Sequence, residues 1–349
     1  MSSAPIIECR SIGKVFRTHR RAKDAGFLRS LLRREVAEFV ALRDVSLSIP
    51  TGQMVGLIGA NGAGKTTLVK CLSGIIPASS GTATLFGRDC FYLRDQEKRR
   101  LSLVMGQRSQ LWWDIPAMDS FRLLKEIYAV DAVTFERRVR EHAERLGVAD
   151  RLDVQLRHLS LGQRMKMEII GAFVHEPDVV FLDEPTIGLD LVSQETIREF
   201  LRDINRRLGV TIVLTSHDRA DREQTCERLI LLDAGALLFD GRLLDLQRRL
   251  VQRRFIEIHL EPGSQGWRPE FAAEVASFGA SLVREAPLML SFDVPADRSQ
   301  AFIQRLFDLF QVHDLNVERQ PLEELVKQIF RKGEMTPTSE TSASEASLP

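Results

Sequence analysis

The sequence predicts an α/β fold with a mainly parallel core sheet, followed by a smaller α+β domain. Three observations support this prediction. A glycine-rich motif, Gly59–Thr66, lies between a short apolar run and a helical segment. Further apolar runs of strand length alternate with helical segments as far as about Leu250. After Leu250 the strand-like runs become short and alternating, which indicates a second domain of a different type.

The composition narrows the class of protein. The chain has 349 residues, enough for one large or two medium domains, and 44% of them are hydrophobic. Lys and Arg together number 48, as do Asp and Glu, so net charge does not favour a polyanionic partner. The cysteines are scattered without metal-ligand spacing, which favours a reducing compartment over a disulfide framework or a zinc site. They are Cys9, Cys71, Cys90 and Cys226.

The sequence also lacks the usual signals for membrane insertion. Its first residues contain neither the charged nor the apolar region of a signal peptide. No apolar run approaches the ~20 residues that a membrane-spanning helix needs. We therefore expect a soluble protein whose membrane role, if it has one, comes through a partner.

Two strands are predicted near the N-terminus, over Ile6–Ile12 and Val40–Ile49. In the second strand Val45, Leu47 and Ile49 alternate with two serines, as in a sheet with one face exposed to water.

A basic insertion separates these two strands. Residues 17–39 hold seven Lys or Arg against three acidic residues. Four apolar residues lie within it at helical spacing: Phe27, Leu28, Leu31 and Leu32. A basic amphipathic segment can contact lipid headgroups or a membrane partner. A solvated surface hairpin explains the same composition, so both interpretations stay open.

The motif Gly59-Ala60-Asn61-Gly62-Ala63-Gly64-Lys65-Thr66 matches the phosphate-cradling loop of nucleoside triphosphatases. Its glycines allow backbone N–H groups to converge on anionic oxygens. Lys65 supplies positive charge for the β- and γ-phosphates, and the Thr66 hydroxyl can bind Mg²⁺. A predicted strand, Val55–Ile58, precedes the motif and a predicted helix, Thr67–Leu72, follows it. A glycine-rich turn alone would not explain Lys65 and Thr66, so we predict nucleotide binding.

Downstream, buried strands and helices alternate. The predicted strands are continuous apolar runs, as in a parallel sheet covered on both faces: Val179–Leu182, Val210–Leu214 and Leu229–Leu232. The predicted helices are Thr134–Leu146, Met165–Phe173 and Ser193–Leu208.

Two carboxylates follow the first of these strands directly. Because Asp183 and Glu184 lie at the carboxyl end of a strand beside the phosphate loop, Asp183 can hold Mg²⁺ through water. Glu184 can then polarise an attacking water as general base. A pair of solvated acids at a strand end is the alternative interpretation.

The C-terminal part predicts the order β-α-β-β-α-β, which suggests a small ferredoxin-like domain. Its elements are Ile256–Leu260, Pro269–Phe278, Ser281–Arg284, Leu288–Val294, Asp297–Phe310 and Leu315–Val317. A further helix is predicted over Leu322–Phe330. The tail from Gly333 to Pro349 is rich in Ser, Thr, Glu and Ala without periodicity, and its composition predicts disorder.

The motifs together resemble those of the ATP-binding subunit of ATP-binding-cassette (ABC) transporters. They occur in the family's order: Walker A (59–66), a Q-loop ending at Gln107, a signature (Leu159-Ser160-Leu161-Gly162-Gln163), Walker B (Asp183-Glu184), a D-loop ending at Asp190, and a switch loop containing His217. The resemblance spans Ile6 to about Leu250, about seven-tenths of the chain. It departs from the family at Leu161, where the signature usually has a first glycine.

The resemblance implies an ABC ATPase domain over residues 1–250, with a parallel core sheet, an antiparallel β subdomain and a helical subdomain, and an accessory domain over 251–332. It implies ATP and Mg²⁺ as cofactors. The implied ATP-binding residues are Phe16, Gly59, Asn61, Gly62, Ala63, Gly64, Lys65, Thr66, Thr67, Ser160, Gly162, Gln163 and Asp190. Those implied for Mg²⁺ are Thr66, Gln107 and Asp183, and those for hydrolysis are Glu184, His217 and Gln107.

The resemblance also implies partners. Two such subunits, identical or related, sandwich ATP head to tail, with Walker A of one facing the signature of the other. Separately encoded integral-membrane permease subunits hold them at the cytoplasmic face of the cell membrane. Trp112-Trp113, just after the Q-loop, suggests a socket for the permease, although core packing of one tryptophan is compatible with that. This segment, the basic insertion and the extra C-terminal domain together resemble an exporter-type subgroup of the family.

The role of Phe16 and the function of the whole chain each have an alternative interpretation. Phe16 resembles in placement the aromatic residue that stacks on adenine in the family, but an ordinary core phenylalanine is an alternative. For the whole chain, the alternative is a soluble ABC ATPase that acts on nucleic acid or ribosomes. The chain has one cassette, no heptad run and no zinc module, and it lacks the Asn-Lys-x-Asp motif of a regulatory GTPase. We therefore expect a transport subunit without a nucleic-acid partner.

Overall fold

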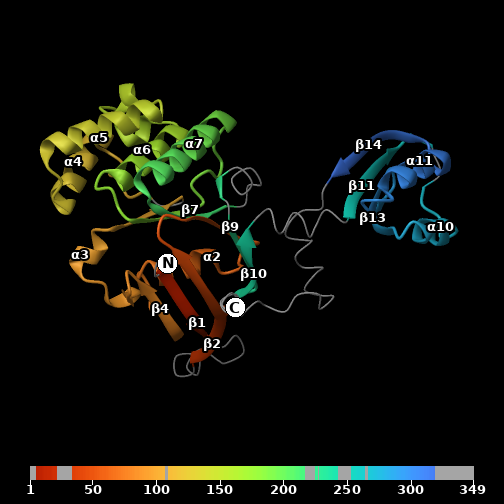
Figure 1. The fold of residues 1–349 in the computed structure, drawn as a ribbon, viewed down its shortest axis with the longest axis horizontal. Helices are drawn as coiled ribbons and strands as arrows, with labels where there is room; N and C mark the ends of the chain where they lie inside the picture. Colours follow the sequence, from red (N-terminus) through yellow and green to blue (C-terminus); the bar gives the residue numbers. More distant parts are fainter. Residues whose placement is uncertain are drawn as a thin grey trace, which may run out of the picture. The chain divides into compact units, whose positions relative to one another are not determined.

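The computed structural model describes residues 5–21, 34–106, 109–216, 225–226, 228–242, 253–263 and 266–318 (Figure 1). The chain divides into two compact units, the first reaching Gly241 and the second beginning at Arg242.

An antiparallel sheet forms the N-terminal part of the first unit. Its strands are β1 (Pro5–Arg21), β2 (Arg34–Pro50), β4 (Ser80–Leu85) and β5 (Arg88–Asp89), in the order β2-β1-β4-β5. Val45, Leu47 and Ile49 are buried and the intervening serines are exposed, which confirms the predicted alternation.

The long β1–β2 hairpin includes both ends of the basic insertion. Pairing of β1 with β2 extends from Pro5 opposite Pro50 to Arg21 opposite Arg34. Residues 17–21 and 34–39 are therefore paired strands, as in the surface-hairpin interpretation. Both strands are longer than their apolar runs predicted, because backbone pairing continues where the side chains are polar. The apolar residues at helical spacing, 27–32, lie outside the described residues.

A six-stranded sheet forms the core of the first unit. Its strands are β3 (Met54–Ile58), β6 (Leu101–Met105), β7 (Val179–Asp183), β8 (Thr211–Thr215), β9 (Arg228–Asp233) and β10 (Ala236–Arg242), in the order β10-β9-β3-β8-β7-β6. The pairs from β9 to β6 are parallel. Every residue of β3, β7 and β8 is buried, as the continuous apolar runs predicted.

Helix α2 (Lys65–Leu72) lies between the two sheets and contacts β1, β2, β4 and β7. Leu68, Val69 and Leu72 belong to one core with residues of both sheets. Because α2 is fixed on both sides, its N-terminus is held at the carboxyl end of β3. A short helical pair, η1 (Cys90–Tyr92) and α3 (Asp95–Lys98), follows the β4–β5 hairpin.

Four helices cluster beside the core sheet (Figure 1). They are α4 (Ala117–Tyr128), α5 (Ala132–Arg145), α6 (Leu161–Phe173) and α7 (Leu191–Leu208), with the short turns η2 (Ala149–Arg151) and η3 (Leu156–His158) between α5 and α6. Helix α6 contacts α4, α5, α7 and β6. On α5 the predicted stripe of Phe135, Val139, Ala143 and the following Leu146 is buried.

The second unit has the predicted β-α-β-β-α-β order. Its elements are β11 (Arg253–Leu260), α10 (Phe271–Ser277), β12 (Ser281–Ala286), β13 (Met289–Pro295), α11 (Ser299–Leu309) and β14 (Val312–Glu318). The sheet order is β12-β13-β11-β14 with antiparallel neighbours, a ferredoxin-like arrangement. Ile256, Ile258 and Phe292 pack with Phe302 and Leu306 of α11. The predicted helix over residues 322–330 and the tail lie outside the described residues.

Across the part of the chain that the structure describes, none of the helices combines the length and the apolar character that crossing a bilayer requires.

Candidate nucleotide-binding site

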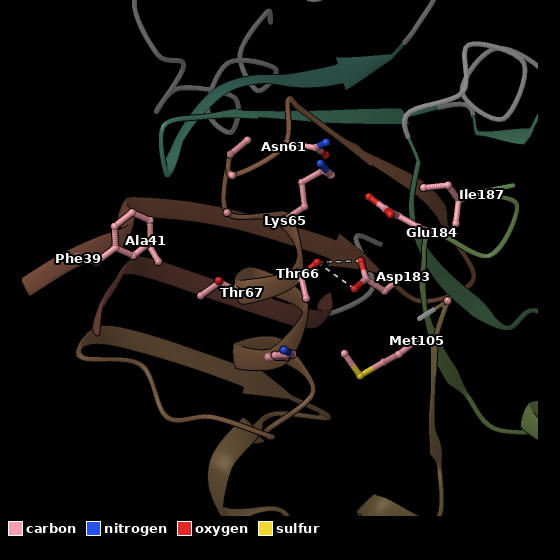
Figure 2. Close-up of a pocket in the computed structure, with 15 residues that line it drawn as sticks. Phe39, Ala41, Asn61, Lys65, Thr66, Thr67, Met105, Asp183, Glu184 and Ile187 are labelled. Atoms are coloured by element: carbon pink, nitrogen blue, oxygen red, sulfur yellow. Dashed lines mark hydrogen bonds between the residues drawn. The ribbon is translucent and has the colours of Figure 1, made fainter. Parts of the chain in front are cut away.

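A cavity of about 750 Å³ opens at the N-terminus of α2 (Figure 2). The phosphate loop forms one side of it, the ends of β6 and β7 form another, and the hairpin strand β2 contributes the remainder. Its lining residues are Phe39, Ala41, Asn61, Gly62, Ala63, Gly64, Lys65, Thr66, Thr67, Lys70, Met105, Gly106, Asp183, Glu184 and Ile187.

The phosphate loop has backbone angles that favour glycine. Gly62 has a φ of 82° and Gly64, the N-cap of α2, has a φ of 103°. No side chain of the described residues caps this helix end. The N–H groups of the first turn are therefore available to an anion, and the helix dipole adds partial positive charge there.

Lys65 lies within the loop and is only 5% exposed. Its Nζ donates to the carbonyl oxygens of Gly59 at 2.8 Å and Ala60 at 3.2 Å. Burial lowers the pKa of the Lys65 ammonium, and the nearby Glu184 and Asp183 carboxylates oppose that shift. An anionic ligand in the cavity would likewise stabilise the charged form.

Thr66 and Asp183 meet at the wall of the cavity (Figure 2). The Thr66 hydroxyl donates to Asp183 Oδ2 at 2.9 Å and lies 3.2 Å from Oδ1. A hydroxyl and a carboxylate side by side offer the hard oxygen ligands that Mg²⁺ prefers, so these residues fit the ion that the sequence predicted. The third residue predicted for Mg²⁺, Gln107, lies outside the described residues.

Glu184 follows Asp183 at the end of β7 and also lines the cavity. Its backbone has a φ of 55°, which is uncommon for a residue with a side chain. Its N–H donates to Thr215 Oγ1 at 2.9 Å and lies 3.2 Å from the Thr215 carbonyl oxygen. The predicted partner of Glu184, His217, lies outside the described residues, two positions beyond Thr215.

The signature residues do not line this cavity. Ser160 is the N-cap of α6, where its Oγ accepts the Gln163 N–H at 3.2 Å and Gln163 Oε1 accepts the Ser160 N–H at 3.0 Å. A hydroxyl that accepts a bond in this way still has its own hydrogen to donate. Leu161, the residue that departs from the family, is 46% exposed in the first turn of α6.

The D-loop residue Asp190 lies next to the signature instead of in the cavity. It caps α7, accepting the Ser193 N–H at 2.8 Å and the Ser193 hydroxyl at 2.7 Å. These bonds lower the pKa of the Asp190 carboxyl. Gly162 packs against this cap so closely that a Cβ there would be 2.5 Å from Ser193 Oγ. The signature and the D-loop are therefore one packed surface.

Of the described residues, the aromatic one that lines the cavity is Phe39, which the sequence analysis did not single out. Phe16, which the sequence predicted beside adenine, is not among the lining residues. Phe16 and Phe39 are directly opposite each other on β1 and β2, and they are 37% and 59% exposed. Directly opposite residues share a face of the sheet. Phe39 follows Phe16 by 23 positions in the chain, and the register of the hairpin places the two residues side by side. Of the two, Phe39 is the one that lines the cavity with the phosphate loop.

Trp112 and Trp113 form an exposed pair after the Q-loop, with exposed fractions of 45% and 47%. Two residues of α6 hold their segment. The guanidinium of Arg164 lies 4.7 Å from the centre of the Trp113 ring. The buried Glu168 carboxylate accepts bonds from the Ser109 hydroxyl and from the backbone N–H groups of residues 110 and 111. Burial raises the pKa of the Glu168 carboxyl, and these bonds oppose the shift.

The fold and the cavity define a P-loop nucleoside triphosphatase. The family model described as "ABC transporter" matches residues 42–187. The ABC transporter ATP-binding protein NatA of Bacillus subtilis (strain 168) is 31% identical over 59% of this chain and 83% of its own length. The methionine import ATP-binding protein MetN of Geobacillus kaustophilus (strain HTA426) is 33% identical over 64% of this chain and 67% of its own.

Two further comparisons agree. The Nod factor export ATP-binding protein I of Cupriavidus pinatubonensis (strain JMP 134 / LMG 1197) is 32% identical over 65% of this chain and 70% of its own. A solved ATP-binding subunit of an ABC transporter has the same fold, with a TM-score of 0.58 at 24% identity over 70% of this chain and 92% of that one. The chain therefore belongs to the ATP-binding proteins of ABC transporters, and it is an ATPase subunit of a transporter.

Proposed function

We propose that two ATPase subunits, either two copies of this chain or this chain and a related one, close head to tail around ATP and Mg²⁺ and separate after hydrolysis. The observation that supports this is the composition of the cavity. It contains the phosphate loop and both carboxylates, but Ser160, Gly162 and Gln163 lie elsewhere, at the exposed N-terminus of α6. A second subunit can present that helix end to the γ-phosphate, where hydrogen-bond donors and the helix dipole favour negative charge.

Within one such site, each residue has a proposed role. The loop N–H groups and Lys65 bind the phosphates, and Thr66 with Asp183 holds Mg²⁺. When bound, the ion neutralises charge that develops on the phosphate oxygens. Glu184 accepts the proton of the attacking water. By resemblance to the family, Gln107 contacts Mg²⁺ and the attacking water, His217 contacts the γ-phosphate and Glu184, and Asp190 belongs to the ATP-binding residues.

We propose Phe39 as the residue that stacks on adenine, in place of Phe16. Phe39→Ala is expected to weaken ATP binding about 5- to 100-fold, because base–aromatic stacking contributes about 1–3 kcal/mol per base. Binding of inorganic tripolyphosphate, which lacks a base, should not change. Titration of both ligands by calorimetry measures this. Phe16→Ala is the matched control, and a loss of ATP affinity in Phe16→Ala but not in Phe39→Ala would restore the original assignment.

We propose that the Trp112–Trp113 pair docks onto an integral-membrane permease, which places the chain at the cytoplasmic face of the cell membrane. Exposed tryptophans are common centres of protein interfaces. The hydrogen bonds that Glu168 accepts from this segment and the contact with Arg164 hold the segment on α6, so less conformational entropy is lost on docking.

We propose export as the direction of transport. The match to the Nod factor export protein supports this, as do the basic hairpin and the additional C-terminal unit. A methionine import protein matches at similar identity, so membership of the family alone does not set the direction.

The proposed partnership is tested by purification of the tagged chain from mild-detergent extracts. We expect one polytopic membrane protein to accompany the native chain and to be lost from a Trp112→Ala/Trp113→Ala variant. A second exposed aromatic pair, Phe91→Ala/Tyr92→Ala in η1, is the matched control and should retain the partner. Recovery of ribosomes or DNA in place of a membrane protein would favour the soluble-ATPase alternative.

A further inference from the structure

Thr215 is a fully buried residue at the end of β8, directly opposite Asp183 on β7. Its hydroxyl makes two hydrogen bonds of opposite sense. It donates to Asp183 Oδ1 at 2.7 Å and accepts the Glu184 N–H at 2.9 Å. One side chain therefore connects the two carboxylate residues of the site.

The two oxygens of Asp183 have different main partners. Thr215 binds Oδ1 from within the sheet, while Thr66 makes its shorter bond, 2.9 Å, to Oδ2 on the cavity side. A carboxylate held at one oxygen cannot rotate freely about its last side-chain bond. Thr215 therefore keeps Oδ2 directed at Thr66, the other residue that fits Mg²⁺.

The same hydroxyl also supports the backbone of Glu184. With its φ of 55°, Glu184 is in a region that residues with side chains rarely adopt and that is kept only where surrounding structure enforces it. The two oxygens of Thr215 hold the N–H of Glu184 from the β8 side. On the β6 side Gly106 packs so closely that a Cβ there would be 2.6 Å from the Glu184 carbonyl oxygen.

We propose that Thr215 is a positioning residue for ATP hydrolysis: its hydroxyl orients Asp183 toward Mg²⁺ and fixes the backbone from which Glu184 reaches the cavity. It does not line the cavity itself. The inference rests on the proposed roles of Asp183 and Glu184. Groups that orient metal ligands in this way typically change metal affinity or activity by about 10- to 100-fold when they are removed.

A purely structural role for Thr215 would lead to a different expected result. If Thr215 only filled the end of a buried strand, valine would replace it well, because valine has nearly the same shape and favours strands. Valine lacks the hydroxyl, however, and leaves Asp183 Oδ1 without the donor at 2.7 Å. Serine keeps the hydroxyl and loses only a methyl group. Comparison of Thr215→Val with Thr215→Ser therefore distinguishes a role in orienting Asp183 from a role in packing the end of the strand.

The experiment measures ATP affinity with Mg²⁺ and with EDTA in chains that also carry Glu184→Gln, so that turnover does not interfere. With Mg²⁺, we expect Thr215→Val to bind ATP about 10- to 100-fold more weakly than its parent. With EDTA, its ATP affinity should be unchanged. Its melting temperature should lie within a few degrees of that of its parent. Thr215→Ser should keep most of the ATP affinity that Mg²⁺ adds. In chains with Glu184 intact, Thr215→Val should raise KM for ATP with Mg²⁺ and should also lower kcat, because the backbone that carries Glu184 loses its bond to the Thr215 hydroxyl.

Two outcomes overturn the inference. In the first, Mg²⁺ raises the ATP affinity of Thr215→Val as much as that of its parent. In the second, Thr215→Ser loses as much of this Mg²⁺-dependent affinity as Thr215→Val does. If Thr215→Val does not fold, Thr215→Ala removes the same hydroxyl without adding a methyl group and is judged by the same measurement. Asp183→Asn distinguishes this inference from the proposed function. If Mg²⁺ still raises the ATP affinity of Asp183→Asn, the proposed metal site itself is wrong. If Asp183→Asn loses this increase in affinity while Thr215→Val keeps it, only the proposed role of Thr215 is wrong.

Discussion

Glu184→Gln is expected to lower ATP turnover by about 10²- to 10⁴-fold, the usual contribution of a positioned general base. Glutamine has the shape of glutamate but cannot accept the proton of the attacking water. The backbone bonds of residue 184 to Thr215 do not involve its side chain, so the loop geometry should persist. ATP binding should therefore remain, and phosphate release is the direct measurement.

The same substitution tests the proposed pairing of subunits. If ATP holds two subunits together and hydrolysis separates them, Glu184→Gln with Mg²⁺ and ATP should accumulate as a dimer in size-exclusion chromatography with light scattering. The exposed Glu199 of α7 provides the matched control, since Glu199→Gln removes the same charge away from the cavity. Normal turnover in Glu184→Gln would contradict the assignment of the base. A monomer that binds ATP without turnover would contradict the sandwich.

Lys65→Ala is expected to weaken ATP binding by about 10- to 100-fold, because a charged hydrogen bond contributes about 1.5–3 kcal/mol. The Lys65 ammonium is buried beside the loop carbonyls, within the cavity, and no other residue of the loop carries a positive charge. Calorimetric titration with Mg²⁺ and ATP measures the loss. Lys98→Ala, on the exposed helix α3, removes a lysine without touching the cavity and should bind normally.

The lowered pKa of Lys65 adds a prediction about the ligand-free chain. Burial favours the neutral amine, so between the folded and the unfolded pKa the unfolded chain binds more protons. The free energy of unfolding should therefore rise as pH increases through this window. Lys65→Met, which fills similar space without charge, should lose that rise in thermal melts and should be at least as stable below the window. A Lys65→Met chain that binds ATP normally would contradict the proposed role of the charge.

Much of the first unit was predictable because its signals are local. A glycine-rich loop before Lys65 and Thr66 needs particular residues at fixed spacing, whatever the rest of the chain does. The buried strands were visible as continuous apolar runs because both faces of a parallel sheet are covered. The carboxylates at the end of β7 followed from the same argument, since strand ends in such sheets meet beside the phosphate loop. The order of elements in the second unit was also readable from its alternation.

Other features of the site depended on pairing between distant segments. Phe39 lines the cavity because of the register between β1 and β2, which local composition does not specify. The hydroxyl of Thr215 looks in the sequence like one more strand residue, and its two bonds exist only because β8 lies beside β7. Glu168 falls within a helical pattern as an ordinary polar residue, yet it is buried against residues 109–111, almost sixty positions earlier.

The sequence by itself therefore determined which chemistry the chain carries: a phosphate loop, two carboxylates at a strand end and a signature motif, each defined by residues that are neighbours in the chain. Only the tertiary structure decided which side chains surround that chemistry. It placed Phe39 and not Phe16 at the cavity, connected Thr215 to Asp183, and kept Ser160 and Gly162 out of the cavity that holds Lys65. The physical reason is that strand register and helix packing depend on the apolar surface buried across the whole core. A single stretch of residues does not determine how much surface that is.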